Sequence, residues 1–204
     1  MPKASQREIY NGEISAGSLL VSESRVVAEF LLKNLDEPAW EQAILTNNVL
    51  QKRNPTSARR QARLIRNRLA LMPPEMLHLI AHSGMDDRVQ ATLAAAIKHS
   101  RLLGDFMAKI VGQHWRTFQQ KLNRKDWTDF LENCAQVDAR VLNWTPNTRS
   151  KLKQVTFRIL AEAGYVDSTR SLQLLPVRIV PKVRHCLEKH NETYVLNCMD
   201  ATNQ

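Results

Sequence analysis

The chain has 204 residues, of which 43% are hydrophobic, so it can form one large or two small folded domains rather than remain disordered. Its formal net charge is +9, which favours an acidic partner such as a nucleic acid. No apolar run approaches the roughly 18 residues that a membrane span needs and no charged-then-apolar leader opens the sequence, so we expect a cytoplasmic protein with no membrane partner.

Two helices are predicted before residue 50. Ser22 or Ser24 is expected to cap the first helix, and Asp36 is expected to cap the second, because short polar side chains accept hydrogen bonds from the free amides of a first helical turn. The inward faces are predicted to carry Val26, Val27, Phe30 and Leu31 in the first helix, and Trp40, Ile44 and Leu45 in the second.

A basic helix is predicted over 57–71, within a segment (residues 42–85) that has seven basic residues and one acidic residue. Pro55-Thr56 is the start signal and Pro73-Pro74 the stop signal. At about 100° per residue, one stripe of the helix is apolar. That stripe consists of Ala58, Ala62, Ile65, Leu69 and Met72. Arg59, Arg60, Arg63 and Arg66 fall on an arc of about 120° away from it.

The arginines of this helix have the spacing of a phosphate-binding surface. Arg59, Arg63 and Arg66 form a line about 10 Å long, and the planar guanidinium group suits phosphate oxygens. The predicted contact residues of this segment are Lys52, Arg53, Arg59, Arg60, Arg63, Arg66 and Arg68. The alternatives are a solvated face and a face neutralised by residues 1–41 or by an acidic partner protein.

Helical periodicity continues through the middle of the chain. A short helix follows Pro74, and a longer apolar pattern from Asp86 to Phe118 is expected to break between Ser100 and Asp105. Two acidic pairs, Asp86-Asp87 and Asp126/Asp129, are placed like carboxylates at helix starts. The alternative for these pairs is the metal chemistry of a nuclease.

The last third combines a second basic run with a feature typical of winged-helix domains. Asn147 or Thr148 is expected to start a helix that ends at Gly164. This helix contains the basic residues Arg149, Lys151, Lys153 and Arg158, which form either a second nucleic-acid surface or a solvated face. The helix, the glycine, an apolar pair and a polar turn predict at most a small β wing near 165–180, although a plain loop fits the same order.

No constellation in the sequence predicts catalysis, a metal or a cofactor. The three cysteines, Cys134, Cys186 and Cys198, are odd in number and irregularly spaced, which argues against a disulfide framework. His185, Cys186, His190 and Cys198 match no zinc spacing, and there is no Gly-rich phosphate loop. The chain is therefore expected not to be an enzyme.

Several stretches together resemble the BrxA family of BREX phage-defence systems. They are ISAGSLLVSESRVVAEFLL, TNNVLQKRNPTSARRQARLIRNRLALMPPEMLHLIA, LLGDFMAKIV and TRSKLKQVTFRILAEAGYV. The resemblance covers nearly the whole chain and consists of ordered helices and semi-polar motifs rather than a catalytic signature.

The resemblance implies a mainly α, monomeric protein similar in part to the antitermination factor NusB and to helix-turn-helix modules. It also implies binding of double-stranded DNA beside the other components of the defence system, and it gives no catalytic residue. We expect two lobes, 1–122 with the basic helix and 123–204 with the possible winged-helix unit. A protein–protein adaptor and an RNA-binding, antitermination-like factor are the alternative functions.

Overall fold

The structure, a computed structural model, describes residues 9–202, so the outer ends of the two predicted lobes at 1–8 and 203–204 lie outside it. Within that range the fold is built from helices, with no sheet, and the prediction of a mainly α protein is confirmed. The α-helices are α1 (Val21–Leu32), α2 (Glu37–Glu41), α3 (Pro55–Leu69), α4 (Pro74–His82), α5 (Met85–His99), α6 (Arg101–Phe106), α7 (Gly112–Arg116), α8 (Arg124–Val137), α9 (Pro146–Glu162), α10 (Pro181–Lys189) and α11 (Thr193–Met199).

Shorter helical turns connect several of these elements. They are η1 (Glu13–Ala16), η2 (Gln42–Thr46), η3 (Met107–Val111), η4 (Ala139–Asn143) and η5 (Asp200–Thr202). Among residues 9–202, no helix combines the length and apolar character that a membrane crossing requires.

Prolines in the first helical turn determine where several helices begin. Asp36 caps α2 as predicted, accepting from the Ala39 amide at 2.9 Å. However, the cap of α3 is Asn54 rather than Thr56, and the cap of α9 is Thr145 rather than Asn147 or Thr148. In both cases a proline follows at the first helical position, where its missing N–H costs no hydrogen bond, so the capping residue is the one before the proline.

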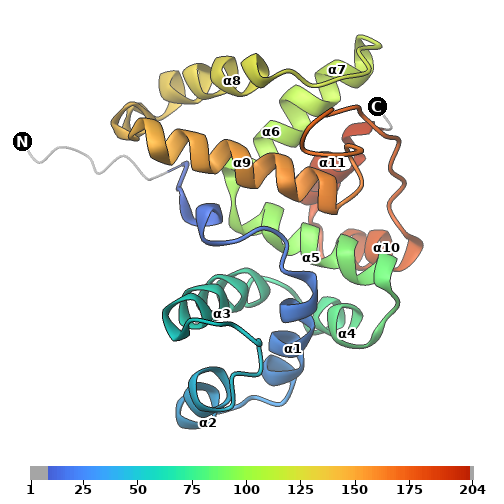
Figure 1. Ribbon diagram of the computed structural model, residues 1–204. Helices are drawn as coiled ribbons and strands as arrows, with labels where there is room; N and C mark the ends of the chain where they lie inside the picture. Colours follow the sequence, from blue (N-terminus) through green and yellow to red (C-terminus); the bar gives the residue numbers. More distant parts are fainter. Residues whose placement is uncertain (1–8, 203–204) are drawn as a thin grey trace, which may run out of the picture.

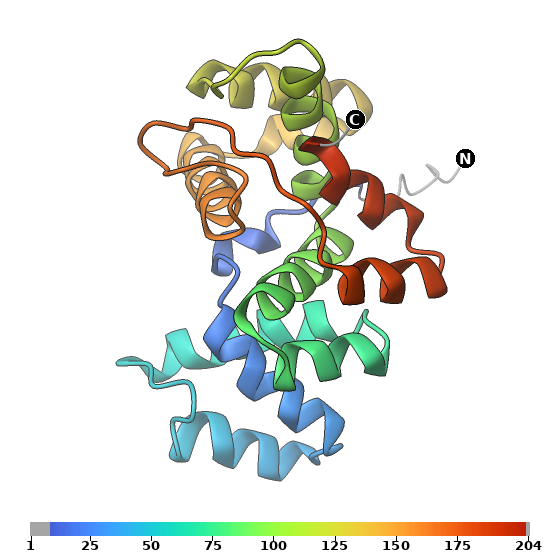
Figure 2. The same cartoon turned by 90° about the vertical axis from the view of Figure 1, so that its right-hand side faces the viewer.

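α1, α2, α3 and α4 form one end of the molecule, α5 runs through the middle, and α6 to α9 form the other end (Figure 1). α1 packs against α3, α4 and α5. The last two helices do not stay with α8 and α9, because α10 contacts α4 and α5 while α11 contacts α5 and α6 (Figure 2). α10 and α11 thus connect the two ends of the molecule. The predicted lobe boundary near residue 122 stays a prediction.

An aromatic cluster holds α6 against α8 and α9. The Phe106 ring lies 5.4 Å from Trp127, 5.2 Å from Phe130 and 5.9 Å from Phe157 between ring centroids. All four side chains are buried, and aromatic pairs at these distances add to the free energy gained by burial. The cluster fixes the position of α9, which carries the second basic run.

Asp105 on α6 is a buried carboxylate that ties the chain ends to the middle. Its oxygens accept hydrogen bonds from Tyr10 Oη and Tyr194 Oη, both at 2.8 Å, and pair with Arg101 and Lys109 at 2.9 and 3.0 Å. Burial alone would raise the pKa of Asp105, but these hydrogen bonds outweigh it and the pKa lies below its ordinary value. The carboxylate therefore stabilises the fold in its ionised form.

The predicted break between α5 and α6 is confirmed, and it lies at Ser100. Ser100 has an extended backbone, and its Oγ accepts from the Leu103 amide at 3.4 Å. Gly104 lies inside α6, where a Cβ would come within 2.3 Å of Tyr194 Oη. The glycine thus allows α11 to approach α6 closely enough for Tyr194 to reach Asp105.

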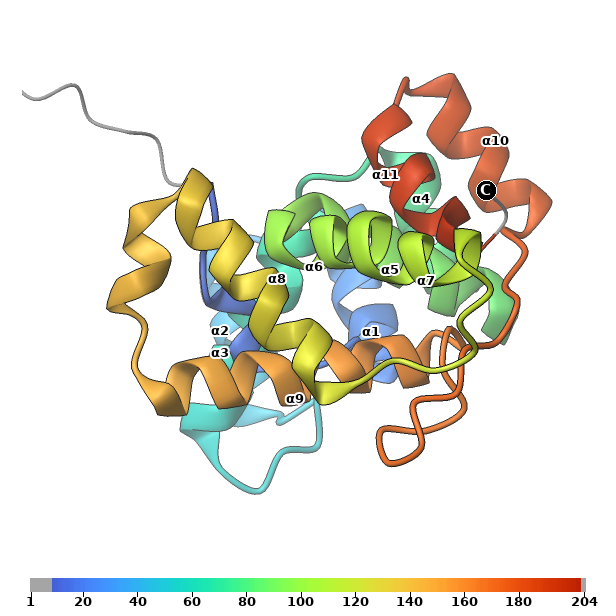
Figure 3. The ribbon, with the colours of Figure 1, turned by 90° about the horizontal axis from the view of Figure 1, so that it is seen from above.

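The β structure near 165–180 is limited to two isolated antiparallel bridges within the described residues. α9 ends at Glu162, and Gly164, two residues later, has a φ of +78°, which suits a residue without a Cβ. Val166 then pairs with Leu174, and Gln173 pairs with Lys121 from the segment before α8 (Figure 3). The segment before α8 and the two segments after α9 thus lie side by side.

Candidate nucleic-acid interface

The predicted inward stripe of the basic helix is confirmed. Ala58, Ala62, Ile65, Leu69 and Met72 are all buried. They face the core that α1 and α5 form with α3. The opposite side of α3 is therefore the side available to a partner.

Three arginines of α3 face solvent without a carboxylate partner. Arg59, Arg60 and Arg63 are exposed, and among residues 9–202 none of them forms an ion pair. Two shallow grooves flank them. One, of about 460 Å³, lies between α2 and α3, and the other, of about 280 Å³, lies between η1 and α3. Arg63 borders both grooves, so the exposed arginines occupy the ridge between them.

Two further members of the predicted contact set already have acidic partners. Arg66 Nη1 lies 2.8 and 3.1 Å from the two carboxylate oxygens of Glu37, and its guanidinium carbon lies 4.7 Å from the centre of a Trp40 ring. Lys52 forms an ion pair with Glu23. These two side chains are neutralised within the molecule, whereas Arg53 is exposed.

Arg68 is not a surface residue, and its prediction as a nucleic-acid contact is wrong. Its side chain is 1% exposed, and it donates to the carbonyl oxygens of Ser18 at 2.6 Å and Gly17 at 3.2 Å. Burial lowers the pKa of Arg68 to about 10, and the nearby Glu162 carboxylate opposes that shift. These buried hydrogen bonds thus hold the segment before α1 against α3.

The second basic run is only partly available. Arg149 donates to the carbonyl oxygens of Val141, Leu142 and Trp144 at 3.1–3.2 Å, so it caps the end of η4. Arg158 is exposed but pairs with Glu162 at 2.8 Å. Lys151 is exposed and Lys153 half-buried, and among residues 9–202 neither forms an ion pair.

The fold adds basic residues to this run that the sequence analysis missed. Arg124 at the start of α8 lines a groove of about 380 Å³ together with Lys153, Arg158 and Thr169. Arg170, next to Thr169 in the loop between the bridged segments, is exposed. The polar turn DSTRS marked that loop in the sequence, but only the folded chain places it beside α8 and α9.

The segment leading into α1 connects the two basic helices. Glu162 at the end of α9 accepts hydrogen bonds from Ser18 Oγ and the Leu19 amide, both at 2.9 Å. The carbonyls of Gly17 and Ser18 in turn accept from Arg68 of α3. η1 contacts both helices. α3 and α9 are therefore held in a defined relative position.

The acidic pairs and the C-terminal His and Cys residues, the alternatives for metal or nuclease chemistry, lie in separate places in the fold. Asp87 pairs with Lys182, and Asp126 belongs to the capping box of α8. Neither acidic pair joins a group of three metal-ligating side chains within residues 9–202. Cys198 is buried against α5 and α6, whereas Cys186 and His190 lie together against α4.

Comparison with known proteins assigns the chain to a family. The BrxA family model matches residues 8–191. The chain belongs to the BrxA family. A BREX protein BrxA from Paramagnetospirillum magneticum is 40% identical over 95% of this chain and 97% of its own length. One from Escherichia coli is 31% identical over 93% of this chain and 89% of its own length, and one from Bacillus cereus is 26% identical over 88% and 92%.

A solved structure also matches the whole architecture. The crystal structure of an uncharacterized protein from Magnetospirillum magneticum superposes with a TM-score of 0.88 at 39% identity, covering 95% of this chain and all of that one. The resemblance to the BrxA family drawn from the sequence is thereby confirmed.

Proposed function

We propose that the chain is a DNA-binding accessory protein of a BREX phage-defence system that contacts duplex DNA through α3. The observation that carries the proposal is the ridge of Arg59, Arg60 and Arg63, which is exposed and has no carboxylate partner among residues 9–202. Charges left uncompensated on a rigid helix favour a polyanion, and arginine suits phosphate. Arg53, at the entrance to α3, extends the same surface.

The arrangement around α9 supports a second contact surface. α8, η4 and α9 follow one another as two helices joined by a short turn, and the bridged segments flank them before α8 and after α9. This is the order of elements in winged-helix modules, in which the second helix and the wing face DNA. The proposed contacts here are Lys151, Lys153 and Arg158, with Arg124 and Arg170.

The proposed mode of action is binding rather than catalysis, by a monomer that works beside other components of the defence system. Phosphate contacts of this kind bind DNA with little sequence preference. The same surface could bind RNA in an antitermination-like role, so the nucleic-acid class must be compared directly.

An adaptor function is the second candidate, and three exposed apolar side chains favour it. Phe118 is 91% exposed, and Val137 and Leu142, on either side of the junction between α8 and η4, are 61% and 63% exposed. Apolar side chains in solvent gain free energy when a partner protein covers them. On this alternative, the basic ridge would dock on an acidic protein surface.

The test is a salt titration of binding by fluorescence anisotropy, with duplex DNA, single-stranded DNA and RNA of matched sequence. The parent should bind the duplex, with log K falling by about 0.9 per phosphate contact for each unit of log salt. Replacing Arg59, Arg60 and Arg63 together by Gln removes three contacts of roughly 1 kcal/mol each, so affinity at low salt should fall on the order of a hundredfold.

A matched control removes three exposed cations elsewhere, by replacing Lys33, Arg178 and Lys182 with Gln. Both triple variants have the same net charge, so a general electrostatic effect would weaken both equally. Equal loss in the two variants, or no binding of the parent at low salt, would refute the proposed surface and leave the adaptor function.

A further inference from the structure

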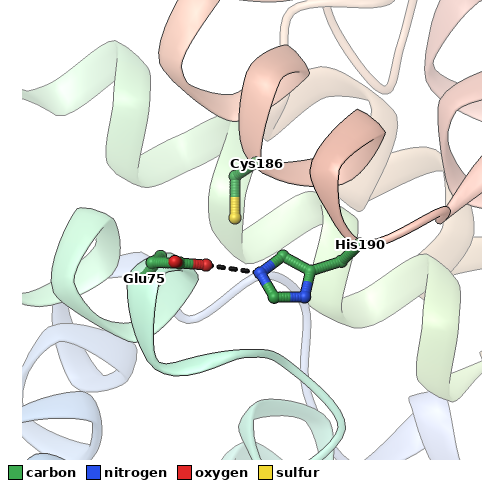
Figure 4. A group of neighbouring side chains, drawn as sticks. All are labelled: Glu75, Cys186 and His190. Atoms are coloured by element: carbon green, nitrogen blue, oxygen red, sulfur yellow. Dashed lines mark hydrogen bonds and ion pairs between the residues drawn. The ribbon is translucent and has the colours of Figure 1, made fainter.

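Three side chains of metal-binding type meet between α4 and α10, and none of them belongs to either basic surface. The ligand atoms of Glu75, Cys186 and His190 all lie within 4.8 Å of one another (Figure 4). Cys186 is buried, whereas Glu75 and His190 are exposed. The cluster is therefore closed on the protein side and open to ions in solution.

Helix geometry explains how the cluster forms. Cys186 and His190 are four residues apart at the end of α10, so their side chains lie on the same face of that helix, one turn apart. α10 packs against α4, whose first turn carries Glu75 opposite this face. Figure 4 shows the Glu75 carboxylate pointing at the His190 ring, with Cys186 above both.

The three groups suit zinc in both chemistry and distance. Zinc binds Cys, His and carboxylate ligands at about 2.0–2.3 Å in a tetrahedral arrangement, which places the ligand atoms about 3.3–3.8 Å from one another. The present separation of up to 4.8 Å exceeds this by about 1 Å. Rotation of the exposed Glu75 and His190 side chains can close that gap while the buried Cys186 stays in place.

We propose that Glu75, Cys186 and His190 form a zinc site, with water as the fourth ligand. The metal takes the place of the hydrogen bond between His190 Nε2 and Glu75 Oε2, so the proton on Nε2 must leave to solvent and the neutral ring keeps its one proton on Nδ1. The Cys186 thiol proton also leaves to solvent as the thiolate binds. Lys189 pairs with the other oxygen of Glu75, so it holds the carboxylate in position without occupying the oxygen that faces the ring.

The bound metal would link α10, near the end of the described chain, to α4 in its first half. Glu75 and His190 are 115 residues apart in sequence. A metal bound only by the folded chain stabilises it in proportion to the logarithm of the metal concentration over the dissociation constant. Zinc should therefore raise the melting temperature of the full chain and reduce the mobility of α10 against α4.

The experiment uses the full chain after dialysis against a chelator. Zinc is titrated in competition with a chromogenic chelator, and Co²⁺ is used as a spectroscopic substitute for zinc. The parent should bind about one Zn²⁺ per chain. The Co²⁺ form should show a thiolate-to-metal charge-transfer band. Cys186→Ser should abolish that band, and Glu75→Gln and His190→Ala should each weaken zinc binding at least about tenfold.

His185→Ala is the matched control, because His185 is an exposed histidine on the same helix, next to Cys186 but outside the cluster. It should bind zinc like the parent. Since Cys186 is buried, the helix content of Cys186→Ser is checked by circular dichroism, and Cys186→Ala replaces it if it is lost. A parent that binds no zinc, a charge-transfer band that survives loss of Cys186, or equal loss in His185→Ala and His190→Ala would overturn the site.

Discussion

The two basic surfaces of the molecule are built in opposite ways. The α3 surface comes from one helix, whose exposed arginines are neighbours in the sequence. The α9 surface is assembled from the start of α8, the exposed side of α9 and the loop at 169–170. A basic residue in the sequence is therefore not always a charge available to a partner, because Arg68 and Arg149 donate to the protein's own carbonyl groups.

A different buried charged residue stabilises the helices that carry each surface. Arg68 lies beneath α3, and Asp105 lies on α6, whose Phe106 packs on α8 and α9. Stability and binding should therefore be separable at both surfaces.

Replacing Arg68 by Ala should cost about 3 kcal/mol of unfolding free energy. The change leaves the carbonyl groups of Gly17 and Ser18 unpaired in the core and removes a buried side chain. Arg60→Ala, on the exposed side of the same helix, should change stability by no more than about 0.5 kcal/mol. Urea unfolding measures both. A similar small loss in the two variants would show that Arg68 does not serve the core.

Replacing Asp105 by Asn should cost about 2 kcal/mol, because hydrogen bonds to an ionised group are stronger than those to a neutral one. The pKa of Asp105 is lowered in the folded chain, so its contribution is present above the unfolded value of about 4 and is lost as pH falls through the lower folded value. The parent should therefore lose more unfolding free energy between about pH 5 and pH 3 than Asp105→Asn does. Identical pH dependence in the two proteins would contradict this role. DNA affinity at neutral pH should not change in the variant.

Replacing Arg124, Lys153 and Arg170 by Gln should lower DNA affinity by about tenfold, a smaller effect than at α3 because these three cations come from separate segments. Combining the change with the α3 triple variant distinguishes two geometries. Additive losses would indicate that both surfaces contact the same duplex, whereas no effect of the α9 change in either background would leave α3 as the sole contact.

Local features of this fold could be predicted from the sequence because they depend on neighbours along the chain. The stripe from Ala58 to Met72, the cap at Asp36 and the break near Ser100 all follow from helical spacing and capping chemistry. The prediction of Arg68 as a surface contact was wrong because this residue lies at the edge of the apolar stripe, only about 40° from Met72 on the helical wheel. The residues that bury it, Gly17 and Ser18, come from 50 residues earlier.

The α9 surface and the cluster of Glu75, Cys186 and His190 could not be predicted, because their residues come from distant parts of the chain. Arg124 and Arg170 join Lys153 only through the bridges between 121, 166, 173 and 174. Glu75 joins Cys186 and His190 only because α10 returns to α4. In the sequence, His190 appears with His185 and Cys198, but neither of these belongs to the cluster.

The return of α10 and α11 to the first half of the chain also has a consequence for synthesis. α4 and α5 are synthesised well before residues 181–199, so the apolar faces that α10 and α11 cover stay open while the segment between them is added. Glu75 meets its partners on α10 only after more than a hundred further residues have been added. The first half of the nascent chain must therefore remain soluble by itself until its last two helices arrive.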